Sequence, residues 1–133
     1  MNLNGSALAY LGDSFYEHHI RSYLINLGLT KTNDLHKKAT HFTSAAAQAK
    51  IIKYLKENVL TEEEILYYKK GRNISHPGRK NISSNTYHES TGFEALTGYL
   101  SITNEKRAVE LIEISINYVE VNYGKEKEWI NTR

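Results

Sequence analysis

Two acidic side chains stand alone in otherwise uncharged segments, and both could bind a divalent cation. Asp13 lies in the segment ALAYLGDSFY, between Leu11 and Phe15, which are core candidates. Glu94 lies in STGFEALTGYL, where no other residue is charged. Carboxylates in apolar surroundings are rare unless they are paired or bound to metal. Mg²⁺ prefers oxygen ligands, and the bound ion can activate water and stabilise charge that develops at phosphorus.

Each acid also has an ordinary explanation, and the residues alone leave it open. Asp13 could lie on the solvent side of an amphipathic helix. Glu94 could form a structural salt bridge with Arg21 or Lys70. Glu17 follows Asp13 by one helical turn, so both side chains face the same way. It could orient a water at the metal, hold a basic residue, or simply be a surface residue.

The positive charge is concentrated in two blocks, although the formal net charge is only +2. Six lysines and one acid between Lys31 and Lys56 give +5, and five basic residues without an acid between Ile65 and His88 give +5 again. Such blocks suggest a local anionic partner, or else a solvated charged face. The turn Lys69–Asn73 (KKGRN) offers cations and an amide to phosphate or ribose.

Several other chemistries are excluded or lack a motif. The chain has no cysteine, so thiol catalysis, zinc–thiolate sites and disulfides are excluded. The six histidines form no metal-binding pattern, and neither a Ser-His-Asp elbow nor a glycine-rich phosphate loop is present. The ten tyrosines could stack on bases, but they fit a helical core and its rim better. No segment of the sequence is long and apolar enough to span a bilayer. The N-terminal segment does not resemble a signal peptide, so we expect a cytoplasmic protein.

The elements that position these residues are predicted to be helices, because helical periodicity is widespread along the chain and strand signals are weak. A length of 133 residues predicts a single domain. Gly28 is expected to end the first helix. The N-cap of the second helix is expected at Thr32 or Asn33, and that of the third at Ser44. The T-x-x-E capping box from Thr61 is expected to start the fourth helix. Residues 71–85 are expected to form one long irregular loop, and the tail from residue 124 to fray. The predicted helices cover residues 6–27, 34–40, 45–57, 61–70, 86–101 and 105–122.

The residues around the two acids resemble the signatures of ribonuclease III domains. Residues 8–15 (LAYLGDSF) are similar to the pattern E-x-L-E-F-L-G-D-[SA], and residues 93–100 (FEALTGYL) to D-x-x-E-A-L-x-G-A-x-[YF]-L. The closer resemblance is to the Mini-ribonuclease III group, which has no appended double-stranded-RNA-binding domain. Further similar segments are NDLHKK at 33–38, Ser44-Ala45 with Gln48, KGRN at 70–73, Lys80-Asn81 and Thr86-Tyr87.

The chain departs from the general family pattern at three acidic positions. Ala9, Ser6 and Thr91 stand where relatives carry carboxylates, so only Asp13 and Glu94 of the usual acidic set remain. The small group shares these losses, which indicates a variant site rather than an inactive one. The number of metal ions per site stays open. The segment 74–78 also differs from the group's basic and small pattern.

The resemblance implies an all-α domain that forms a two-fold homodimer with two active sites along one cleft. It implies a Mg²⁺-dependent endoribonuclease, in which Mn²⁺ could substitute, acting on double-stranded RNA. The expected substrate is precursor large-subunit ribosomal RNA, in ribosome biogenesis, with a ribosomal protein as a possible helper. A chain without the accessory domain should bind RNA in a strongly salt-dependent way.

The roles expected from the resemblance fall on a few positions. Asp13 and Glu94 would be the catalytic metal ligands, with Glu17 and Asn81 supporting them from behind. RNA phosphates would be bound by Lys70, Arg72, Asn73, Lys80, Lys37 and Lys38. The alternative is a catalytically silent module of this fold that binds structured RNA in a ribonucleoprotein. A helical protein–protein adaptor is a third interpretation, and it predicts no salt-dependent RNA binding.

Overall fold

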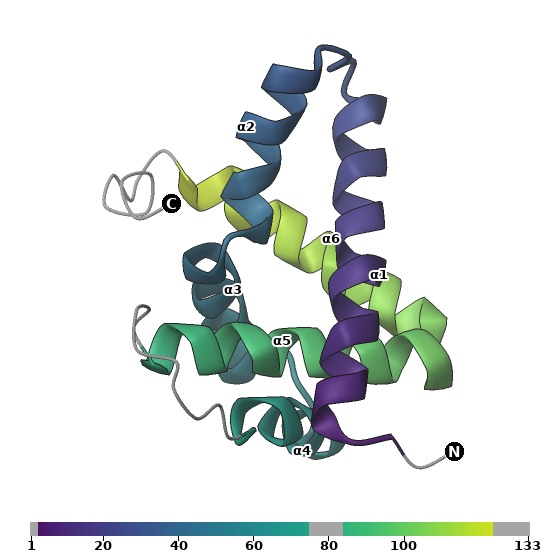
Figure 1. The fold of residues 1–133 in the computed structure, drawn as a ribbon, viewed down its shortest axis with the longest axis vertical. Coiled ribbons are helices and arrows are strands. Elements are labelled where there is room, and N and C mark those ends of the chain that lie inside the picture. The colour runs from purple at the N-terminus through teal and green to yellow at the C-terminus, as the bar shows by residue number, and fades with distance from the viewer. Residues whose placement is uncertain (1–2, 75–83, 124–133) are drawn as a thin grey trace.

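The computed structural model describes residues 3–74 and 84–123, and these form an all-α fold. Figure 1 shows a bundle of crossing helices, with no strand among the described residues. None of these helices has both the length and the apolar character needed to cross a membrane. The helices are α1 (Gly5–Asn26), α2 (Thr32–Thr43), α3 (Ala45–Asn58), α4 (Glu62–Arg72), α5 (Ser84–Thr103) and α6 (Glu105–Asn122).

Helix α5 is the central element, and it runs across the middle of the bundle (Figure 1). It packs against α1, α3 and α4, and less extensively against α6. Its middle is uncharged apart from Glu94, and Phe93, Leu96 and Leu100 are buried in the main core. A helix that is apolar on most of its faces must be enclosed by others, so Glu94 is placed in the interior of the bundle by the element that carries it.

Side chains of Asn4, Ser44, Thr61 and Asn104 cap four of the described helices, and the caps at Ser44 and Thr61 were predicted from the sequence. Ser44 accepts a hydrogen bond from the amide of Ala47 at 3.1 Å. Thr61 and Glu64 form the expected capping box, each accepting from the other's backbone amide. Gly28 has φ +97° just after α1, a left-handed conformation that glycine adopts without strain.

Three local predictions require correction. The second helix is longer than predicted, and its N-cap is Lys31, whose side chain makes no cap hydrogen bond, rather than Thr32 or Asn33. Helix α5 begins at Ser84 and ends at Thr103, which is two residues beyond the predicted range at each end. The fourth helix runs to Arg72, so the predicted loop starts later. Helix ends fray and depend on tertiary contacts, which explains offsets of this size. Most of that loop, residues 75–83, and the tail from residue 124 lie outside the described residues.

Glycines allow α1 and α4 to approach the backbone of α5. A Cβ added at Gly12 would stand 1.8 Å from the carbonyl oxygen of Glu94, and one at Gly98 would stand 1.9 Å from that of Leu8. A Cβ at Gly71 would stand 2.6 Å from the carbonyl oxygen of Thr91. No side chain fits at these positions, so the glycines set the spacing of the helices around Glu94.

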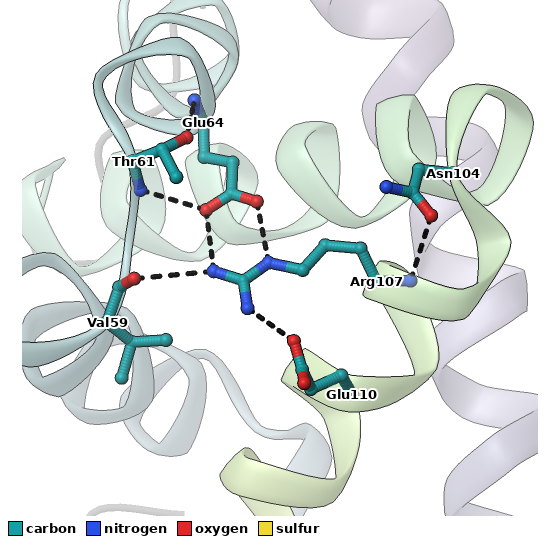
Figure 2. Close-up of polar contacts among 6 residues, drawn as sticks. All are labelled: Val59, Thr61, Glu64, Asn104, Arg107 and Glu110. Atoms are coloured by element: carbon teal, nitrogen blue, oxygen red, sulfur yellow. Dashed lines mark hydrogen bonds and ion pairs between the residues drawn. The ribbon is translucent and has the colours of Figure 1, made fainter.

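The start of α6 is fastened to α4 by an ion pair (Figure 2). Arg107 donates to both carboxylate oxygens of Glu64, at 2.7 and 2.9 Å, and also to the carbonyl oxygen of Val59. The Glu64 side chain is only 6% exposed. Its hydrogen bonds with Arg107 are the main reason why the pKa of Glu64 is lowered. This bidentate geometry is the stronger form of a charged hydrogen bond, and it fixes α6 across the bundle.

Candidate metal centre

The two isolated acids meet at the crossing of α1 and α5. Asp13 follows Gly12, whose Cα lies against the main chain of Glu94. The Asp13 carboxyl comes within hydrogen-bonding reach of the Glu94 carboxyl. Asp13 is exposed, whereas Glu94 is half-buried, so the pair has an open side and an enclosed side. The structure therefore brings together the two residues that the sequence singled out.

Without a cation, these carboxylates are held in an unfavourable arrangement. The pKa of Glu94 is raised from 4.5 to about 8, first because burial disfavours its charged form. The negative charge of Asp13 and a hydrogen bond with its carboxyl raise it further, and the charge of Glu17 adds a smaller effect. A hydrogen bond from Gln48 acts in the opposite direction and favours the charged form. A perturbed carboxyl beside a second carboxyl is typical of a functional site.

Glu17 lies close enough to affect the site, but its own carboxylate is engaged. Its Oε2 accepts from Nε of Arg21 at 3.1 Å, one turn along the same helix. Arg21 is therefore paired with Glu17, and Lys70 lies over the ring of Tyr67, with its Nζ 4.9 Å from the ring centroid. The salt bridge considered between Glu94 and either of these cations is not formed in the described residues.

The three positions at which relatives carry acids hold uncharged residues here, so they add no carboxylate to the site. Thr91 is buried, and its hydroxyl donates to the carbonyl oxygen of Tyr87 at 3.0 Å. Ala9 is buried in a small apolar cluster with Leu8 and Ala95. Ser6 is exposed near the start of α1. Among residues 3–74 and 84–123, no three metal-binding side chains of the His, Cys, Asp and Glu types converge.

Two carboxylates with an open side fit a hard divalent cation. Mg²⁺ is usually bound by one or two carboxylates, with waters and substrate phosphates filling the remaining positions. The donor set of Asp13 and Glu94 consists of oxygens alone, and a cation between them would relieve the repulsion that raises the pKa of Glu94. Both residues could therefore serve as metal ligands.

The second acid on α5, Glu89, is already paired. Glu89 accepts from Nζ of Lys56 at 3.0 Å and from the hydroxyl of Tyr68. Lys56 also donates to the hydroxyl of Tyr68, at 2.9 Å. These three residues join α3, α4 and α5 in a closed polar group that the sequence did not predict, because its members are far apart along the chain. Glu89 is thus part of the scaffold rather than of the metal site.

Gln48 is the other residue whose role at the site was not assigned from sequence. It lies on α3, is 2% exposed, and contacts both Glu94 and Ser90. Its only sequence signal was a lone amide in the alanine-rich segment SAAAQA, which resembles a segment of the Mini-ribonuclease III group.

The basic end of α4 presents three of the predicted RNA-binding residues. Lys70 is exposed, and Arg72 is half-buried against the ring of Tyr68, 5.5 Å from its centroid. Nε of Arg72 donates to the side-chain oxygen of Asn73 at 3.1 Å, next to the helix end. Lys70 and Asn73 are exposed at this end of α4, while the backbone of Lys70 packs against the start of α1 at Gly5.

The other predicted RNA-binding residues have different settings. Lys37 is exposed on α2. Lys38 donates to Glu120 at 3.1 Å, and Glu120 also accepts from the hydroxyl of Tyr23. With Lys38 and Lys56 both in ion pairs, the first basic block is less positive toward solvent than its sequence suggests. Lys80 lies outside the described residues, as does Asn81, which was predicted to support the metal ligands.

Comparison with known proteins identifies relatives along most of the chain. The Ribonuclease III domain family matches residues 6–105, which include both carboxylates. A protein of Acholeplasma laidlawii named Mini-ribonuclease 3 is 50% identical over 118 residues, covering 88% of this chain and 94% of the relative. The protein of the same name from Enterococcus faecalis is 49% identical and covers 95% of each chain. A crystal structure of a Fusobacterium nucleatum protein has a TM-score of 0.76 at 27% identity, covering 87% of this chain and 93% of that one.

Proposed function

The chain belongs to the ribonuclease III domain family and is an endoribonuclease, and on that premise we propose that it cuts double-stranded RNA with Mg²⁺ held between Asp13 and Glu94. The observation that supports this proposal is the meeting of the two carboxylates at the contact between Gly12 and α5. A half-buried acid with a raised pKa beside a second acid has little structural use, but it suits a divalent cation.

In the proposed mechanism, the protein positions charge rather than forming covalent bonds. Mg²⁺ at this site would supply Lewis acidity and the positive charge that a phosphodiester needs as negative charge develops on its oxygens. Asp13 is exposed, so it lies on the side of the site that RNA would approach. Glu94, on the enclosed side, is half-buried on α5, beside the core residues Phe93 and Ala95. Catalysis by positioning and electrostatic stabilisation requires fixed ligands.

RNA binding is proposed to use cations that remain available to solvent. Lys70, Arg72 and Asn73 at the end of α4, with Lys37 on α2, can contact phosphates without reading bases. From their sequence positions, we propose Lys80 for the same surface and Asn81 as a support behind the metal ligands. Lys38 is proposed to contribute less, because Glu120 already holds its ammonium group. Duplex RNA is recognised mostly through its shape, phosphates and 2′-hydroxyls, so a base-specific code is unnecessary.

We also propose that the active form is a two-fold homodimer and that its substrate is precursor large-subunit ribosomal RNA, with a ribosomal protein as helper. Two equivalent sites related by a two-fold axis suit the two strands of a duplex.

Incubation with an end-labelled RNA duplex, with and without Mg²⁺ at low salt, tests the proposal. The parent protein should cut the duplex only with the cation, and Asp13→Asn should abolish cleavage while leaving duplex binding within about twofold. If Asp13→Asn cuts as fast as the parent, the assignment of the metal ligands is wrong. If the parent binds the duplex but never cuts it in Mg²⁺, the chain is a silent RNA-binding module.

A further inference from the structure

Gln48 is a buried amide that links the metal site to the core. It projects from α3 toward α5 and is 2% exposed, so it cannot satisfy its hydrogen bonds with bulk water. The hydroxyl of Ser90 donates to its Oε1 at 2.5 Å. Because Ser90 occupies the amide oxygen, the amide nitrogen is the end of Gln48 that is left to face the carboxyl group of Glu94. Ser90 and Glu94 lie one helical turn apart on α5, so Gln48 bridges two positions on the same face.

The chemistry of the groups fixes the direction of the hydrogen bonds in this Ser90–Gln48–Glu94 relay. An ionised carboxylate can only accept hydrogen bonds, so Gln48 must turn its NH₂ group toward Glu94. The amide oxygen then needs a donor, which the hydroxyl of Ser90 supplies. Ser90 is itself buried, at 8% exposure, and its hydroxyl is held in the core. The relay is therefore complete only when Gln48 has one orientation.

Glu94 needs such a support because its other neighbours do not orient its charged form. Asp13 repels it, and Glu17 is a second like charge. Gln48 is the buried amide donor beside Glu94, and Ser90, one turn earlier on α5, holds the other end of that amide. Metal-binding carboxylates are generally oriented by hydrogen bonds from residues behind them, and these contacts tune metal affinity.

We propose that Gln48, held by Ser90, is a positioning residue that fixes the ionised carboxylate of Glu94 for divalent cation binding. The inference rests on the proposed function of Asp13 and Glu94 as metal ligands. It assigns to Gln48 no contact with RNA or with the reacting phosphate. Its loss should therefore weaken binding of the cation, while duplex binding and the rate at saturating cation change little.

The test compares Gln48→Leu, which keeps the approximate size of the side chain, with Ser90→Ala, which removes only the donor to the amide. Mn²⁺ affinity is measured by isothermal titration calorimetry on the folded, RNA-free protein. The Mg²⁺ dependence of duplex cleavage is measured in parallel. Gln48→Leu should weaken Mn²⁺ binding and raise the half-saturating Mg²⁺ concentration by about 10-fold or more. Ser90→Ala should shift both in the same direction by a smaller factor.

Ser115→Ala is the matched control. Ser115 is also fully buried, and its hydroxyl donates to Leu111 within α6, away from the metal site. It should lower the melting temperature without changing either cation titration. If Gln48→Leu and Ser90→Ala lower the melting temperature in the same way but leave both titrations unchanged, Gln48 only fills the core and the inference is wrong.

The result is separable from a failure of the proposed function. If the parent binds no Mn²⁺ and does not cut, the metal site itself is wrong. If the parent binds and cuts while the variants match it, only the role of Gln48 is refuted. Should Gln48→Leu fail to fold by circular dichroism, the titrations of Ser90→Ala decide, and an unchanged affinity there overturns the inference.

Discussion

The Cα of Gly12 lies so close to Glu94 that an added methyl group would stand 1.8 Å from the carbonyl oxygen of Glu94. Gly98 meets the carbonyl oxygen of Leu8 in the same way, at 1.9 Å. These contacts join backbone to backbone, so no rotation of a side chain can relieve a substitution. The crossing that brings Asp13 to Glu94 therefore depends on the absence of two side chains.

Gly12→Ala should destabilise the protein strongly and abolish cleavage. Forcing a methyl group into a packed backbone contact costs about 3 kcal/mol or more, since the helices must separate. Gly28→Ala is the control, because a Cβ there meets nothing within 4 Å and only the left-handed φ of +97° opposes it. It should cost about 1 kcal/mol and leave activity intact. Urea denaturation and duplex cleavage would measure both, and equal effects of the two variants would contradict the packing argument.

Glu94→Gln should change how the stability of the metal-free protein depends on pH. The pKa of Glu94 is about 8 in the folded protein and near its ordinary 4.5 when unfolded. Between these values the unfolded chain has released a proton that the folded chain still holds. The free energy of unfolding should therefore fall as pH rises from about 5 to 8, by an amount on the order of a few kcal/mol. Glutamine does not ionise, so this slope should disappear from the variant.

Thermal unfolding in chelator at a series of pH values would measure the effect. The variant should be more stable than the parent at pH 8, and the difference should shrink toward pH 5. Adding Mg²⁺ should restore the stability of the parent alone. If the stability of the two proteins depends on pH in the same way, the pKa of Glu94 is not raised in the folded protein.

Arg107→Met should destabilise the contact between α4 and α6 by leaving Glu64 without its partner. Removing one member of a buried ion pair costs about 3 kcal/mol. Replacing both members, with Glu64→Gln added, should recover part of this loss, because no unpaired charge remains buried. Urea denaturation at pH 7 would measure both variants, and a double variant less stable than the single one would contradict this account.

The same pair predicts an acid dependence with the opposite sign from that of Glu94. The pKa of Glu64 is lowered by Arg107, so its stabilising contribution is present above its unfolded pKa and is lost as pH falls through its folded pKa. The parent and Arg107→Met should thus converge in stability on acidification. A difference that stays constant into strong acid would mean that Arg107 acts through packing alone.

Lys37→Ala and Lys38→Ala should differ in RNA binding, although the two residues are adjacent. Lys37 is exposed, whereas Lys38 is ion-paired with Glu120. Losing one phosphate contact should weaken duplex binding and lower the slope of log affinity against log salt by about 1. We expect this for Lys37→Ala and a smaller change for Lys38→Ala. Fluorescence anisotropy in Ca²⁺ would measure it, and equal slopes would place both lysines on the RNA surface.

The amino-acid sequence by itself determined the helices and the identity of the two acids. Apolar spacing and capping residues such as Ser44 and Thr61 act within one or two turns, so they can be read locally. The signatures around Asp13 and Glu94 indicated the family, and the family match confirms it. The start of α2 at Thr32 was missed because its N-cap, Lys31, makes no side-chain cap hydrogen bond.

Only the tertiary structure decided what surrounds those acids. Gln48 lies 46 residues before Glu94, and Lys38 lies 82 residues before its partner Glu120, so no local pattern joins them. Burial is the main cause of the raised pKa of Glu94, and an ion pair with Glu120 holds the ammonium group of Lys38. Both effects depend on which helices pack together. The close approach at Gly12 and Gly98, which creates the site, is a property of that packing.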